Sequence, residues 1–263
     1  MKTDIVILTR DDELAAKAIT SVAKFCDMSK IGRLVVGWTG EPCSAGLYML
    51  LKLANGLDFD VRVEQMDYNF ARCNNALVAK HCSSEAVLFM NDDAYFQSDA
   101  VTPMLEALGD ERVGTVGIKL LFPDGTIQHA GIFAAWNDDG SFRGVGHIGY
   151  KSRAEFPDLW TIGSTGACMM TRRKDFLAVG GFDERYECCF EDVQYNFEMS
   201  AKLGLRNVTL NSVSAVHAES STRKQSFGGG DGAKLAKYCD KNAAAIQKVL
   251  AKNPAVNSRY ERN

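Results

Sequence analysis

The chain has 263 residues, of which 46% are hydrophobic, 24% charged and 10% aromatic, and its formal net charge is −3. These values are typical of a globular protein with one large or two small domains, and they exclude disordered and collagen-like chains. The slightly acidic balance disfavours a general nucleic-acid-binding protein, and no apolar run reaches the roughly 18 residues that span a bilayer.

The first half of the chain alternates short apolar runs with amphipathic stretches. Strands are expected over residues 4–9, 33–37, 60–64 and 86–90, and helices over residues 14–25, 45–54, 70–80 and 101–108. Asp11 or Asp12 can cap the first helix, and Ser98 the last. This alternation predicts an open, mostly parallel α/β sheet, which binds ligands at the carboxyl ends of its strands.

The second half is less regular. A strand is expected over residues 113–121, a helix from Phe190 to Ala201 that Gly204 ends, and a last short strand over 213–217. The stretch 136–158 is rich in glycine and charge, and we interpret it as a long loop, a pair of short strands or a lid. We expect one domain over residues 1–221, then a flexible Gly-rich segment and a basic helix over 222–263.

Eight cysteines are scattered along the chain without a C-x-x-C pair, at positions 26, 43, 73, 82, 168, 188, 189 and 239. This spacing favours free thiols that serve as small core side chains over a disulfide framework or a zinc site. A strand-like run begins almost at Met1, so no secretory signal is recognised and we expect a cytoplasmic protein.

Three places in the sequence carry candidate chemistry. Asn91–Asp93 directly follows the most apolar run, and two carboxylates there need compensation from a cation such as Mg²⁺ or Mn²⁺; the alternative is an Asp-rich turn. Glu191–Asp192 lies in the first turn of a predicted helix, where acidic residues also complement the helix dipole. His217 ends a predicted strand, where a lone histidine is more often structural than a metal ligand.

Together these places resemble a known family. Asn91–Asp93 after an apolar strand resembles the D-x-D-type motif of glycosyltransferases with the A-type nucleotide-sugar fold (GT-A), and more specifically the large family 2 with its rhamnosyltransferase-like members. The matching segments follow the family order, namely Asn74–Leu77, Phe89–Asp93, Pro123–Gly131, Thr165–Cys168 before Arg172 and Arg173, Gly180–Glu184, Glu191–Asp192 and His217. The resemblance implies a single GT-A type, Rossmann-like domain with a mostly parallel central sheet, followed here by an amphipathic C-terminal helix.

The resemblance also implies a metal-dependent, inverting transfer of a sugar from a nucleotide-sugar donor to an acceptor hydroxyl. It implies that Asp93 and His217 hold Mn²⁺ or Mg²⁺, and that Asp192, with Glu191 beside it, is the catalytic base. A leaving diphosphate develops negative charge that a cation stabilises, and an acceptor hydroxyl needs a carboxylate within hydrogen-bond reach.

The resemblance implies donor contacts from residues at the ends of two strands, namely Asn91, Asp92, Thr9 and Arg10. Trp38 after the second strand and Arg72 and Asn75 on the predicted helix 70–80 are further candidates for donor contacts. Trp38 can stack on a base or serve as a partly buried loop aromatic, and Arg72 and Asn75 can also belong to a solvated helix face. Val36–Gly40 lacks the acidic, Ser-rich turn usual in the family, which leaves the donor nucleotide open. His129 and Trp160 are assigned to the acceptor side, with architectural roles as the alternative.

Two other functions fit parts of the pattern. A sugar-nucleotide nucleotidylyltransferase normally needs a Gly-rich loop after the first strand, and residues 7–12 contain no glycine. A non-catalytic carbohydrate- or nucleotide-binding module would not need both Asp93 and Asp192. The acceptor stays open among glycans, lipid-linked intermediates, proteins and modified nucleic acids, because acceptor loops vary most.

Positive charge is concentrated at the C-terminal end. Residues 222–263 hold nine basic and three acidic residues, a net charge of +6, which leaves residues 1–221 at −9. In the predicted final helix one face is apolar and the lysines lie largely opposite it: Leu235, Cys239, Ala243, Ile246 and Leu250 against Lys234, Lys237, Lys241, Lys248 and Lys252. The lysine face is either simply solvated or contacts an anionic acceptor, a membrane surface or nucleic acid.

Overall fold

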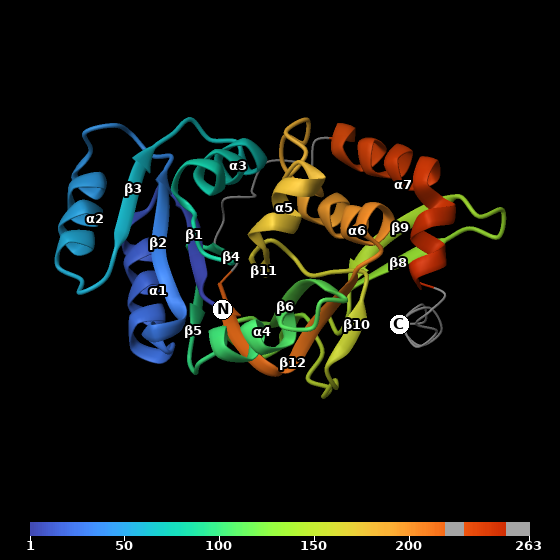
Figure 1. Cartoon of the computed structure of the whole chain (residues 1–263), viewed down its shortest axis with the longest axis horizontal. Helices are drawn as coiled ribbons and strands as arrows, with labels where there is room; N and C mark the ends of the chain where they lie inside the picture. Colours follow the sequence, from blue (N-terminus) through green and yellow to red (C-terminus); the bar gives the residue numbers. More distant parts are fainter. Residues whose placement is uncertain (219–228, 251–263) are drawn as a thin grey trace.

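A mixed β-sheet runs through the molecule, with helices on both of its faces (Figure 1). The structure is a computed structural model and describes residues 1–218 and 229–250. In these residues the main sheet has the strand order β10 (Leu159–Thr161), β12 (Arg206–His217), β6 (Val113–Leu121), β11 (Cys168–Arg172), β4 (Ala86–Asn91), β1 (Thr3–Thr9), β2 (Ile31–Trp38) and β3 (Val61–Gln65). Two short strands extend it, since β5 (Ala94–Phe96) pairs with β12, and β7 (Ile127–His129) with β6.

The half of the sheet built from β3, β2, β1 and β4 is parallel throughout. β11 is inserted antiparallel between β4 and β6, whereas β6 and β12 are again parallel. The fold is therefore the predicted α/β class with a mostly parallel sheet. Of the stretch 136–158, only Phe142–His147 forms a strand after Trp136; this strand, β9, pairs antiparallel with β8 (Ile132–Trp136), which largely precedes the stretch, so the expected pair of short strands within 136–158 is wrong.

The helices are α1 (Asp12–Phe25), α2 (Ala45–Asn55), α3 (Phe70–His81), α4 (Val101–Leu108), α5 (Arg173–Val179), α6 (Glu191–Leu203) and α7 (Gly229–Leu250), with a 3₁₀ turn at Met28–Lys30. Apolar side chains of α1, α2 and α4 share one core cluster with the sheet, and those of α3, α5 and α6 share another. The sheet is therefore buried on both faces, which explains the near-continuous apolar runs of its strands. No helix in the described residues is long and apolar enough to cross a membrane.

Local capping follows the sequence in most places, with one correction. The Asp11 side chain accepts the N–H groups of Glu13 and Leu14 and begins α1, as predicted. Ser98 does not cap α4, because the carboxylate of Asp99 accepts the N–H groups at the start of that helix instead. Gly204 ends α6 in the left-handed conformation, with φ 67°, as predicted.

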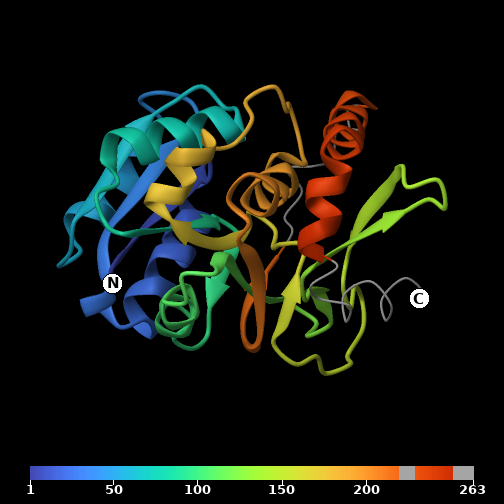
Figure 2. The same cartoon turned by 45° about the vertical axis from the view of Figure 1, so that its right-hand side comes forward.

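The C-terminal helix α7 packs on the rest of the molecule, against α6 and beside the β8–β9 pair (Figures 1 and 2). Leu235, Cys239 and Ile246 are buried in a cluster with residues of α6 and β8. Lys237 and Lys241 are exposed, as predicted for the opposite face. The predicted Gly-rich segment lies mostly outside the described residues, and so does Lys252; the division of the chain at residue 221 stays a prediction.

Candidate active site

The strands β1, β4 and β12 bring their carboxyl ends to one edge of the sheet. β1 and β4 are parallel neighbours, and β12 is tied to the chain after β4 because Ala94 pairs with His217. The backbone N–H of Ala218 donates to the carbonyl oxygen of Asp93 over 3.0 Å. Residues far apart in sequence therefore meet where open α/β sheets bind ligands.

Asp93 and His217 form the centre of this edge. Nε2 of His217 lies 2.9 Å from Oδ1 of Asp93 and 3.2 Å from the amide nitrogen of Asn91. Nδ1 of His217 contacts the side-chain oxygen of Gln128. In the described residues no three His, Cys, Asp or Glu side chains converge as a metal site. The pair therefore offers two protein ligands, and a cation held there would take its other ligands from substrate or water.

Asp92 lies beside this pair in a half-buried position. Burial, together with the charges of Asp93 and Asp11 and against a hydrogen bond from Thr9, raises the pKa of its carboxyl to about 6. The hydroxyl of Thr9 lies 2.7 Å from Oδ2 of Asp92. The structure thus brings together three residues predicted to face the donor, Thr9, Asn91 and Asp92, although Thr9 itself is only 2% exposed.

Asp192 is tied to the same edge through the loop before β11. Its Oδ2 accepts the backbone N–H of Gly166 over 2.7 Å, and its Oδ1 accepts the N–H of Val193 over 2.7 Å. The next residue in that loop, Ala167, accepts the backbone N–H of Asn91 over 3.0 Å. The segment Gly166–Ala167 therefore links Asp192, the predicted base, to Asn91, which directly precedes Asp92 and Asp93.

The chain turns sharply just before this carboxylate. Phe190 has a left-handed backbone, with φ 76°, directly before α6 begins at Glu191. Such a conformation costs a non-glycine residue about 1–2 kcal/mol and persists only where its surroundings fix it. Glu191, which precedes Asp192 in the first turn of α6, is buried and interacts with another group of the chain.

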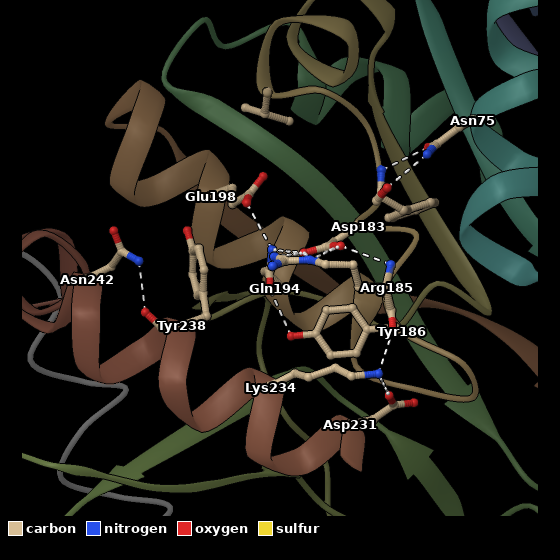
Figure 3. Close-up of polar contacts among 12 residues, drawn as sticks. Asn75, Asp183, Arg185, Tyr186, Gln194, Glu198, Asp231, Lys234, Tyr238 and Asn242 are labelled. Atoms are coloured by element: carbon tan, nitrogen blue, oxygen red, sulfur yellow. Dashed lines mark hydrogen bonds and ion pairs between the residues drawn. The ribbon is translucent and has the colours of Figure 1, made fainter. Parts of the chain in front are cut away.

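The loop that leads to Phe190 is held from α7 (Figure 3). The carboxylate of Asp231, which is 2% exposed, accepts the consecutive backbone N–H groups of residues 187–189 over 2.8–3.3 Å. Lys234 forms an ion pair with Asp231 over 2.9 Å and donates to the carbonyl oxygen of Arg185. The side chain of Tyr186 donates to Gln194 over 2.8 Å. The start of α7 thus supports the segment that positions Glu191 and Asp192.

Several predicted donor contacts do not fit the structure. Trp38 is 2% exposed, belongs to the core, and its ring N–H donates to the carbonyl oxygen of Glu41 over 3.1 Å, so it cannot stack on a base. Asn75 is also structural, because its amide bonds both the N–H and the carbonyl oxygen of Phe182. Arg10 and Arg72 have exposed side chains; their donor contacts stay predictions.

The two predicted acceptor-side residues are corrected as well. His129 is fully buried, and burial, followed by the charges of His147 and His217, lowers its pKa well below the usual value, so it stays neutral and out of reach of an acceptor. Trp160 pairs with Val208 of β12, the strand that His217 ends. β12 bulges after Leu210, so Val208 and Val216 pair with Val116 and Leu121, which are only five positions apart on β6. At about 3.3 Å per residue this places Trp160 roughly 15–20 Å from His217.

Two residues at the site have no counterpart in the sequence predictions. Gln128 contacts His217 from β7, and Asp231 binds the loop before α6 from α7. For Gln128 the sequence did contain a signal, namely the alternation of side chains along a strand. Because neighbouring residues face opposite sides, Gln128 and His129 cannot both face the site, and the prediction chose His129. Nothing in the sequence around Asp231 indicates which backbone amides it binds.

Comparisons with known proteins agree with this geometry. The sequence profile described as Glycosyl transferase family 2 matches residues 47–180, about half of the chain. The chain belongs to glycosyl transferase family 2. The match includes the acidic strand end at Asp92 and Asp93 but neither Asp192 nor α7.

Two curated relatives are each 33% identical to this chain over the aligned residues. They are "O-antigen biosynthesis protein RfbC" of Myxococcus xanthus, aligned over 60% of this chain, and "Uncharacterized protein y4gI" of Sinorhizobium fredii (strain NBRC 101917 / NGR234), aligned over 64%. The aligned parts make up only 12% and 19% of the lengths of these relatives.

Solved structures with the same fold include two glycosyltransferases. GalNAc-T7, solved with UDP, GalNAc and Mn²⁺, superposes with a TM-score of 0.72 at 12% identity, covering 98% of this chain and 52% of its own. The mannosyltransferase PcManGT from Pyrobaculum calidifontis, solved with GDP-Man and Mn²⁺, gives 0.62 at 14% identity, covering 98% and 76%. At these identities the likeness shows the fold, which is the predicted GT-A type.

Proposed function

We propose that this chain is a metal-dependent, inverting glycosyltransferase that uses a nucleotide-sugar donor. The observation that carries the proposal is the joint placement of Asp93, His217 and Asp192 at one edge of the sheet, linked through the Asn91–Ala167 backbone bond. Family membership supports this function over the nucleotidylyltransferase and the binding module. The cytoplasmic location stays a prediction.

The residues at this edge fit a divalent cation. A carboxylate oxygen of Asp93 and the imidazole nitrogen of His217 are donor types that Mn²⁺ accepts, and two protein ligands leave positions for phosphate oxygens. A bound Mn²⁺ or Mg²⁺ would neutralise the charge that develops on the leaving diphosphate. Asp92 lies beside the pair and would complete the wall against the donor, and the hydroxyl of the buried Thr9 holds it in place.

Asp192 is the proposed catalytic base. The acceptor hydroxyl attacks the anomeric carbon, the bond from that carbon to the diphosphate oxygen breaks, and the hydroxyl proton passes to the carboxylate of Asp192. The N–H groups of Gly166 and Val193 fix the orientation of this carboxylate in the first turn of α6. Attack on the face opposite the leaving group inverts the anomeric centre.

For the acceptor we propose a glycan, free or lipid-linked. The support is the name of the Myxococcus xanthus relative, an O-antigen biosynthesis protein. Contact between an anionic acceptor and the exposed lysines of α7 is part of the proposal.

The test measures donor turnover and sugar transfer by the full chain in the presence of Mn²⁺ across a set of nucleotide-sugars and glycan acceptors. With the active donor, Asp192→Asn should lower kcat by about 10²–10⁴-fold and leave Mn²⁺ binding intact, because only proton transfer is lost. Asp93→Asn should weaken Mn²⁺ binding, and EDTA should abolish the activity of the wild type.

Asp58→Asn, a change at an exposed residue, is the matched control and should keep wild-type kinetics. Full activity of Asp192→Asn would remove the base assignment, and an unchanged Mn²⁺ affinity of Asp93→Asn would remove the metal assignment. The anomeric configuration of the product, read by NMR, decides between inversion and retention.

A further inference from the structure

Gln128 lies behind the histidine of the proposed metal site. It sits on β7, is 7% exposed, and its side-chain oxygen contacts Nδ1 of His217. We propose that Gln128 is a positioning residue that fixes the tautomer of His217, so that Nε2 presents its lone pair to the cation. This inference rests on the proposed function, because it takes His217 as a metal ligand.

The tautomer follows from the chemistry of the contact. An amide oxygen can only accept a hydrogen bond, so Nδ1 of His217 must carry the proton that it donates to Gln128. A neutral imidazole carries one ring proton, which leaves Nε2 as a lone pair. The side-chain amide of Asn91 can donate to that lone pair from 3.2 Å.

The surroundings of Nε2 are those of a ligand pair. Nε2 and the carboxylate oxygen of Asp93 both carry electron pairs, and they face each other over 2.9 Å. Two electron-pair donors at that distance need a positive charge between them, which either a proton on Nε2 or a bound cation supplies.

Replacement of Gln128 should therefore act on the metal through His217. In Gln128→Leu the buried Nδ1–H of His217 has no acceptor. The ring proton is then more stable on Nε2, where it can be donated to the carboxylate of Asp93. A protonated Nε2 has no lone pair for a cation. With Gln128→Glu a carboxylate takes the place of the amide, which retains the acceptor and makes Nε2 a stronger ligand.

The experiment measures Mn²⁺ binding by electron paramagnetic resonance of the free ion, with the full chain and the metal alone. Gln128→Leu should raise the Kd for Mn²⁺ by about 10–100-fold, whereas Gln128→Glu should bind as tightly as the wild type or more tightly. Gln65→Leu, a change at an exposed glutamine, is the matched control and should leave the Kd unchanged.

A second readout needs neither metal nor substrate. In ¹⁵N-histidine-labelled, metal-free protein, Nδ1 of His217 should be protonated in the wild type and should lose its proton in Gln128→Leu, with thermal unfolding used to confirm that the variant is folded. Suppose that the wild type binds Mn²⁺ and that Gln128→Leu has the same Kd and the same His217 tautomer. That result would overturn the role of Gln128 and leave the proposed metal site standing. A wild-type chain that does not bind Mn²⁺ would overturn the proposed metal site and this inference with it.

Discussion

Burial separates the residues that can reach a ligand from those that cannot. Asn91 and His217 are 126 positions apart, yet their side chains lie within 3.2 Å at the edge of the sheet. Trp38 and His129 carry groups that suit sugar or base recognition, but at 2% and 0% exposure they serve the interior. Residue type therefore suggests a role, and the position of the side chain relative to solvent decides it.

The Trp38 assignment gives a prediction at this scale. Trp38→Phe should destabilise the fold by roughly 1–3 kcal/mol, because the hydrogen bond to Glu41 and part of the packing against the core are lost. The affinity for the nucleotide-sugar should not change. Chemical denaturation and donor titration of the same variant check both statements, and a large loss of donor affinity in a stably folded variant would restore the stacking role.

At the scale of elements, α7 is part of the support of the candidate active site. Its first turn binds residues 187–189 through Asp231, and its apolar face packs against α6, the helix that carries Asp192. The sequence predicts the amphipathic character of α7, but not that its N-terminal end holds the loop before the proposed base.

Asp231→Ala tests this role of α7. Three backbone N–H groups, two of them partly buried and that of Cys189 buried, lose a charged acceptor, so the free energy of unfolding should fall by about 2–4 kcal/mol. The kcat should fall as well, since the loop leads directly into the turn at Phe190, whereas the Kd for Mn²⁺ should stay at the wild-type value.

The control for this variant is Lys241→Ala, which changes an exposed position on the same helix and should unfold like the wild type. An unfolding free energy of Asp231→Ala equal to that of the control would show that the contacts at the start of α7 do not support the loop.

At the scale of the whole molecule, the net charge of −3 conceals an uneven distribution. Residues 1–221 carry −9 and residues 222–263 carry +6. The apolar face of α7 is buried against the body, so Lys237, Lys241 and Lys248 are exposed to solvent together. This arrangement places a basic surface on an acidic body, at the helix that supports the proposed base.

A triple Lys237, Lys241 and Lys248 to Glu variant tests whether this surface binds anions. At about 1 kcal/mol per lysine, partitioning onto phosphatidylserine vesicles should fall at least on the order of 100-fold, and wild-type binding should weaken as salt rises. Sedimentation with vesicles measures this. The same change at the exposed Lys52, Lys151 and Lys174 has the same effect on net charge and should bind like the wild type if α7 is the surface. Equal loss in both variants would point to net charge alone.

The sequence by itself determined the α/β class and the order of the first strands and helices. It also determined two acidic positions, Asp92 and Asp93 after β4 and Asp192 in the first turn of α6. These features are encoded locally, in the period of apolar residues along one element and in the polar residues that follow it. Only the tertiary structure decided that Trp160 lies far from the site, that Gln128 backs His217, and that Asp231 binds residues 187–189. Those facts depend on the register between strands and on the docking of helices distant in sequence, and no local period carries that information.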